Sequence, residues 1–115
     1  MAIEELNIFQ HLYDFIIWVL PKLEGFPKSY RFVLGQRMGD MLLVLLENLI
    51  DAATKEEKKG YLQRFDSELA KFRVLYRICK DLKIITIRQY AYGINRLEVI
   101  GNLLGGWIKK EVQKQ

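Results

Sequence analysis

The sequence holds little of what builds a metal or thiol site, with one cysteine, Cys79, and one histidine, His11, in 115 residues. A single cysteine forms no internal disulfide, and one residue of each kind cannot supply a zinc site of any usual ligand spacing. Cys79 falls on an apolar helical stripe, so we expect a buried, inert thiol and not a nucleophile. The scarcity of cysteine favours a reducing compartment, and we predict a cytoplasmic protein.

Proline and long apolar runs are also scarce. The chain has two prolines, and no apolar run reaches the roughly 18 residues that cross a bilayer. The N-terminal stretch MAIEELNIFQ carries acids where a secretory signal carries positive charge. We therefore expect no membrane partner. Half of the residues are hydrophobic, which favours one globular domain over residues 1–115.

Signatures of catalysis are missing as well. The stretch VLGQR (33–37) has one glycine and no GK[ST], so it is no phosphate loop. The neighbouring acids Glu4–Glu5 and Glu56–Glu57 point to different sides of a helix, so neither is an acid–base pair. The Glu-x-x-His pairs of metal-binding bundles do not occur. We predict a protein that is not an enzyme and needs no cofactor.

Apolar residues recur at helical spacing in four segments that are separated by short turn signals. The first segment should end at Gly25–Pro27, and the second should run from about Pro27 to Ala53. The centre of the second segment, MLLVLL (41–46), is apolar on every side. Such a helix lies centrally in its bundle, or its outer face meets another subunit.

The third and fourth segments each begin with the spacing of a capping box, Thr54 with Glu57 and Thr86 with Gln89. Their apolar stripes keep alternating spacings of three and four, which is typical of near-parallel helices with knobs-into-holes packing. The stripes are Leu62, Phe65, Leu69, Phe72, Tyr76 and Cys79 in the third helix, and Ile87, Tyr90, Ile94, Leu97, Gly101, Leu104 and Ile108 in the fourth. Short connections make consecutive helices antiparallel, so the pattern predicts an all-α, up-down-up-down four-helix bundle.

The net charge of +4 is unevenly distributed. Residues 1–25 are net acidic, whereas residues 54–83 and 84–115 are both net basic. A lopsided basic surface favours a polyanionic partner. Guanidinium groups bind phosphates in a fork, and tyrosine offers a plane on which a base can stack. The candidate binding residues are Arg73, Arg77 and Lys80 on one face of the third helix, and Arg88, Tyr92 and Arg96 on one face of the fourth. A solvated basic face, partly paired with acids, is the alternative.

Four stretches, in this order, resemble the accessory variability determinant family of diversity-generating retroelements. They are FPKSYRFVLGQRM (26–38), LLENLIDAA (45–53), FRVLYRICKDLKIITIRQY (72–90) and IGNLLGGWIKK (100–110). A related group, encoded in intervening sequences of bacterial 23S ribosomal RNA genes, shares the bundle and an FPK-like start of the second helix. That group carries a SNIAEG-type stretch in the second helix, where this chain has MLLVLLENLIDAA, so the sequence resembles the retroelement family more closely.

The resemblance implies a specific role. Members of the family assemble four-helix bundles into homopentameric barrels with a basic surface, and they bind nucleic acid and the retroelement's reverse transcriptase. With that enzyme they support adenine-mutagenic copying of a template RNA into cDNA, known as mutagenic retrohoming, without being the polymerase. The implied partners are therefore the reverse transcriptase, RNA or cDNA, and further copies of the chain. The alternative is a structural adaptor oligomer, of the ribosomal intervening-sequence type, that has no specific nucleic-acid role.

Within the first stretch, we expect Phe32–Leu34 to enter the core and Gly35 to let a neighbouring helix approach. Arg31 and Arg37 match the family's RFxLGQR positions, and both ion pairing within the bundle and contact with a partner stay open for them. Near the end of the chain, Gly105–Trp107 predicts tight packing or an end of regular helix, with the tryptophan as a packing anchor.

Overall fold

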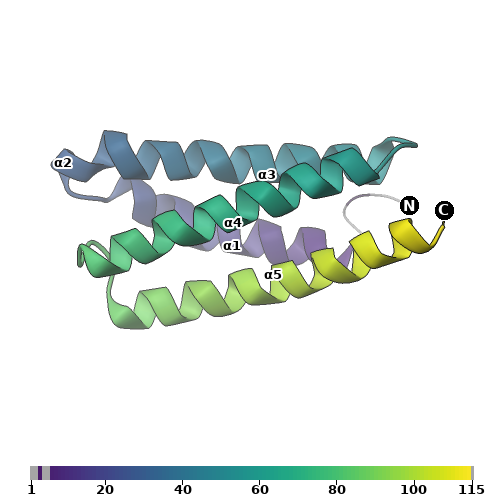
Figure 1. The fold of residues 1–115 in the computed structure, drawn as a ribbon. Coiled ribbons are helices and arrows are strands. Elements are labelled where there is room, and N and C mark those ends of the chain that lie inside the picture. The colour runs from purple at the N-terminus through teal and green to yellow at the C-terminus, as the bar shows by residue number, and fades with distance from the viewer. Residues whose placement is uncertain (1–2, 4–5, 115) are drawn as a thin grey trace.

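Four long helices make up the protein in a computed structural model, which describes residue 3 and residues 6–114 (Figure 1). They are α1 (Asn7–Glu24), α3 (Gln36–Thr54), α4 (Lys59–Asp81) and α5 (Ile87–Gln113), and between α1 and α3 lie a short helix α2 (Lys28–Tyr30) and a π-helical turn η2 (Arg31–Gly35). Each long helix runs opposite to the next, which confirms the predicted up-down-up-down bundle (Figure 1). The described residues contain no β-strand.

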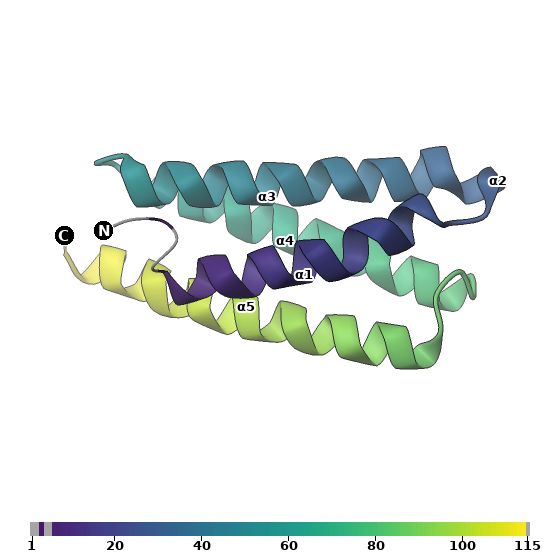
Figure 2. The ribbon, with the colours of Figure 1, turned by 180° about the vertical axis from the view of Figure 1, so that it is seen from behind.

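The helices pack in a closed square, in which α1 and α4 are diagonal to each other. α1 and α4 each lie against both α3 and α5 (Figure 2). The bundle measures 47 × 22 × 22 Å. Because a helix rises about 1.5 Å per residue, the 27 residues of α5 run along most of the long axis. Residues far apart in sequence, such as those of α1 and α5, therefore share a continuous seam.

The core is filled by one stripe from each long helix. The predicted stripe of α4 is confirmed, since all six of its residues are buried. At its centre Phe15 packs edge to face against two rings, and its ring centre lies 5.9 Å from that of Phe72 and 6.5 Å from that of Tyr76. In the apolar stretch 41–46, three residues are buried, while Leu43 and Val44 stay exposed. The square packing covers the inner side of α3 and leaves its outer side, with Leu43 and Val44, open to solvent.

The turn η2 corrects one prediction. Phe32 and Val33 are 69% and 70% exposed, and only Leu34 enters the core. Three consecutive helical residues cannot face one core, because each lies about 100° around the axis from the last. In a regular helix, Arg31 would share the face of Met38 seven residues later. The wider turn rotates Arg31 outward, where its Nε and Nη2 each donate to the Phe26 carbonyl at 3.3 Å.

The connection from α3 to α4 differs from the predicted capping box. Thr54 ends α3 and its hydroxyl donates to the Ile50 carbonyl at 2.9 Å, so it caps no following helix. α4 begins four residues later than predicted from the box, at Lys59, and has no side-chain cap. Lys58 closes the end of α3 instead, because its Nζ donates to the carbonyls of Ala52 and Lys55, both at 2.8 Å.

The start of α5 follows the prediction, and its core stripe follows it in part, since Leu97 and Leu104 of the predicted stripe are buried. The Thr86–Gln89 capping box is present, with both reciprocal hydrogen bonds, at 2.9 and 3.0 Å. Ile87 is 78% exposed at the end of the bundle. The residues of α5 that are buried are Gly93, Leu97, Ile100 and Leu104. Tyr90 and Ile94 of the predicted stripe are partly buried on the side that faces α4, so the true stripe is rotated towards α1.

The predicted role of Gly105–Gly106 is wrong. α5 continues through both glycines to Gln113, and a Cβ added at either position would meet no atom within 4 Å. Trp107, by contrast, is partly buried and packs against the core, which confirms it as a packing residue.

Candidate nucleic-acid interface

The six predicted binding residues lie on α4 and α5, on two different sides of α5. The Arg73 guanidinium donates to the Leu97 carbonyl, and Lys80 lies over the ring of Tyr90, so these residues line the seam between α4 and α5. Tyr92 instead packs against Trp18 of α1. We define the α4–α5 flank as Arg73, Arg77 and Lys80, and the α1–α5 flank as Trp18, Lys22, Arg88, Tyr92 and Arg96. The structure thus places the two predicted groups on two sides of α5, one beside α4 and the other beside α1.

Arg73 is held within the protein. Its Nη2 donates to the Leu97 carbonyl at 2.9 Å, and a Cβ added at Gly101 would lie 2.7 Å from the same nitrogen. Its Nε is buried without a hydrogen-bond partner. The missing side chain at Gly101 makes room for the guanidinium against the backbone of α5. This geometry gives Arg73 a packing role and leaves less of it open to a polyanion.

Arg77 and Lys80 keep their charge near solvent. The Arg77 side chain is 71% exposed and lies 4.0 Å from Asp81, and Lys80 lies 3.6 Å from the same carboxylate. Exposed ion pairs contribute about 0–1 kcal/mol, so Asp81 holds neither base firmly. The Lys80 ammonium also lies 4.6 Å from the centre of the Tyr90 ring. Both basic side chains can therefore reach an external phosphate at small energetic cost.

The α1–α5 flank forms a row in which two adjacent aromatic rings lie between two cationic groups. Lys22 Nζ lies 4.2 Å from the Trp18 ring centre, the Trp18 and Tyr92 centres are 4.6 Å apart, and Arg96 Cζ lies 5.6 Å from the Tyr92 ring. Arg88 precedes Tyr92 by one helical turn and is exposed. Within the described part of the chain, neither Arg88 nor Arg96 forms an ion pair.

Sequence reasoning missed Trp18 and Lys22. They lie on the first helix, in the net acidic part of the chain, and no pattern along the sequence relates them to Tyr92. The signal that could have found them was local. Trp18 and Lys22 are four residues apart, so they share one helical face, and that face is not the buried stripe of α1.

Two buried groups near the flanks have shifted pKa values but face the core. Burial raises the pKa of the Cys79 thiol to about 11, which keeps it protonated and unreactive at neutral pH, as the sequence predicted. Burial, with smaller effects from Cys79 and Tyr90, raises the pKa of Tyr76 above its usual value. The Tyr76 hydroxyl donates to the Gln89 carbonyl at 2.6 Å.

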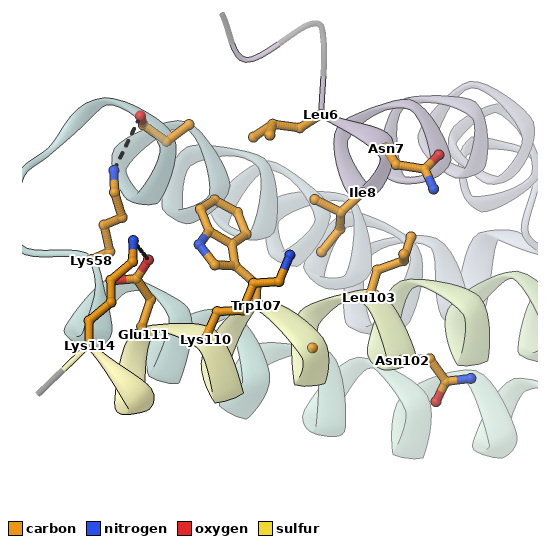
Figure 3. Close-up of a pocket in the computed structure, with 12 residues that line it drawn as sticks. Leu6, Asn7, Ile8, Lys58, Asn102, Leu103, Trp107, Lys110, Glu111 and Lys114 are labelled. Atoms are coloured by element: carbon orange, nitrogen blue, oxygen red, sulfur yellow. Dashed lines mark hydrogen bonds and ion pairs between the residues drawn. The ribbon is translucent and has the colours of Figure 1, made fainter. Parts of the chain in front are cut away.

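A groove of about 620 Å³ lies at the other end of the bundle, between the start of α1 and the end of α5 (Figure 3). Trp107 stands at its centre, beside Leu6 and Ile8, and lysines lie around it. Two of these lysines are engaged, because Lys58 caps α3 and Lys114 pairs with Glu111 at 3.1 Å. In residues 3 and 6–114, no group of three or more metal-binding side chains comes together. No helix in that part of the chain is long and apolar enough to cross a membrane.

Comparison with known proteins places nearly the whole chain in one family model. The model described as bAvd-like matches residues 6–111. No curated protein and no solved structure matches significantly.

Proposed function

Because the chain belongs to the bAvd-like family, the bacterial accessory variability determinants, we propose that it binds nucleic acid and the reverse transcriptase of a diversity-generating retroelement. Membership of the family implies an accessory protein of such a retroelement, and the family is generally non-catalytic. In this proposal the protein supports the copying of template RNA into cDNA, and the polymerase performs the chemistry. The match over residues 6–111 is the observation on which the proposal depends.

The charge of the two flanks supports nucleic-acid binding. Arg77 is largely exposed, Arg88 is exposed, and Arg88 and Arg96 form no ion pair in the described part of the chain. Guanidinium groups that are not neutralised by acids are suited to phosphate. We assign phosphate binding to Arg77, Lys80, Arg88 and Arg96. We assign Arg73 to holding α4 against α5, because its guanidinium is bonded to the α5 backbone.

Replacement of all four of these basic residues by glutamine should weaken RNA binding by at least about a hundredfold near 0.15 M salt. Fewer phosphates are then neutralised, and fewer of the counterions whose release drives binding are set free. The plot of log K against log salt should become less steep, by about 0.7 for each phosphate of a single strand that is no longer neutralised. Fluorescence anisotropy at several salt concentrations measures both quantities.

The matched control is Arg73→Gln, which removes one positive charge from the same helix. We expect this variant to lower the free energy of unfolding by about 1.5 kcal/mol, because it removes a hydrogen bond from a charged donor, and to leave the salt slope nearly unchanged. Binding by the fourfold variant with undiminished affinity would refute the site. No saturable binding by the natural sequence would favour the adaptor alternative.

Self-association is the second part of the proposal. Exposed apolar side chains gather on two separate faces of the bundle. Tyr13 and Ile17 are exposed on α1, and the exposed Leu43 of α3 lines one groove with Leu20 of α1. Another apolar row lies along α4, and consists of Val74, Ile78 and Leu82. Two unlike patches on different faces suit head-to-tail contacts, which close into a ring when the rotation between successive copies closes.

Light scattering should therefore give a mass well above the 13.6 kDa of one chain. About five times that mass is the value for the pentamer that the family implies. Ile17→Glu, which places a charge on one patch, should shift the mass towards that of a single chain, because a charge buried without a partner is costly. A natural protein that scatters as a monomer at micromolar concentration would contradict this part of the proposal.

A further inference from the structure

The contact between α1 and α5 presents an aromatic surface beyond what the packing of the two helices requires. Tyr92 is 48% exposed, although its ring lies 4.6 Å from that of Trp18. An apolar side chain in place of Tyr92 would be enough to close the contact between α1 and α5. Half of the Tyr92 side chain instead faces solvent, between two arginines one turn away on either side.

The groups around this surface complement a nucleotide. Arg88 and Arg96 flank Tyr92 at four-residue spacing and share its helical face. Arg96 Cζ lies 5.6 Å from the centre of the Tyr92 ring, and Lys22 lies beside the Trp18 ring, where its Nζ donates to the Trp18 carbonyl at 3.2 Å. Aromatic rings beside cations that are free to bind phosphate are the elements with which proteins bind single strands.

We infer that Trp18 and Tyr92 form a stacking subsite for a base of single-stranded nucleic acid, with Arg88 and Arg96 on the adjoining phosphates. The inference rests on the proposed function, and it adds the strand state of the ligand and one residue of α1, Trp18. A duplex offers its phosphates but keeps the faces of its bases stacked on one another. The α4–α5 flank therefore binds single and double strands alike, and the α1–α5 flank selects the single strand.

Trp18 itself reports on this subsite. The chain has two tryptophans, so Trp107→Phe leaves Trp18 as the one fluorophore of its kind. In this background, oligo(dT) and oligo(U) should quench Trp18 fluorescence and bind more tightly than a duplex of equal length. Tyr92→Leu should weaken single-strand binding about tenfold, in the range for one stacked base. The slope of log K against log salt should stay the same, because every arginine and lysine that binds phosphate is retained.

Two variants control for side effects. Tyr92→Phe keeps the ring and should retain the affinity of the parent. Phe32→Leu removes an aromatic ring that is 69% exposed on η2, outside both flanks and both apolar patches, and should change nothing. Equal affinity for single and double strands, with constant Trp18 fluorescence and no effect of Tyr92→Leu, would overturn the stacking subsite and leave nucleic-acid binding intact. Failure of both ligands to bind at near-physiological salt would overturn both proposals.

Discussion

Replacement of Gly93 by alanine should lower the free energy of unfolding by about 3 kcal/mol, at the upper end of the cost of overpacking a core. A Cβ at this position would lie 2.0 Å from the Tyr76 hydroxyl oxygen and 2.5 Å from the ring carbon that bears it. Tyr76 cannot move aside, because its ring is buried against Phe72 and Tyr90 and its hydroxyl is bonded to the Gln89 carbonyl. Urea denaturation followed by circular dichroism measures the decrease.

The control lies in the same helix. Gly105→Ala adds the same methyl group where nothing lies within 4 Å, and it should raise the free energy of unfolding by up to about 1 kcal/mol through helix propensity. Tyr76→Phe combined with Gly93→Ala should recover part of the stability, since the closest atom is then absent. Equal stability of the Gly93 and Gly105 variants would show that α5 does not pack against Tyr76 as described.

Gly35→Ala should be similarly damaging, at about 3 kcal/mol. The added Cβ would lie 2.6 Å from the Leu23 carbonyl oxygen and 3.4 Å from its carbon. Both are backbone atoms, so no change of rotamer relieves the clash, and the end of α1 has to move away from η2. The melting temperature and the urea midpoint should both fall.

Gly39→Ala is the matched control, one turn further along the same segment. There the new Cβ would lie 3.5 Å from Leu20 Cδ1, an ordinary van der Waals distance to a flexible side chain. We expect this variant to be neutral or slightly stabilising, because alanine favours the helix. Similar destabilisation at both positions would argue against a specific close approach at Gly35.

The fold was predictable because the spacing of apolar residues along each helix indicates which side of the helix is buried. The α4 stripe repeats at helical spacing, and all of its members are buried. The Thr86–Gln89 capping box, which forms as predicted, depends on residues three apart and needs no tertiary information. Gly35 was also assigned its role from sequence, since a glycine inside an apolar helix usually has a packing reason.

Failures arose where tertiary packing decides between equivalent faces. The predicted α5 stripe favoured large residues such as Ile87, whereas the structure buries Gly93, because its neighbour is the large Tyr76 side chain. The turn η2 was not predicted, because no residue pattern at 31–35 distinguishes π-helical from α-helical winding. At the candidate site, the types and spacing of the residues were readable. Their division into one group on the third helix and one on the fourth was readable too. The position of the second group beside α1 was not, because it depends on which helix lies beside each edge of α5.

The wide turn at Arg31–Gly35 has a consequence for how the protein tolerates changes in length. Between Met38 and the end of α3, an inserted residue would rotate every following side chain by about 100° relative to the interior. Around η2 the winding is already loosened, so an added or deleted residue at the corner changes the pitch locally and leaves the downstream helix in register. The corner between the first two long helices should therefore tolerate insertions and deletions, and natural variation in chain length should concentrate there.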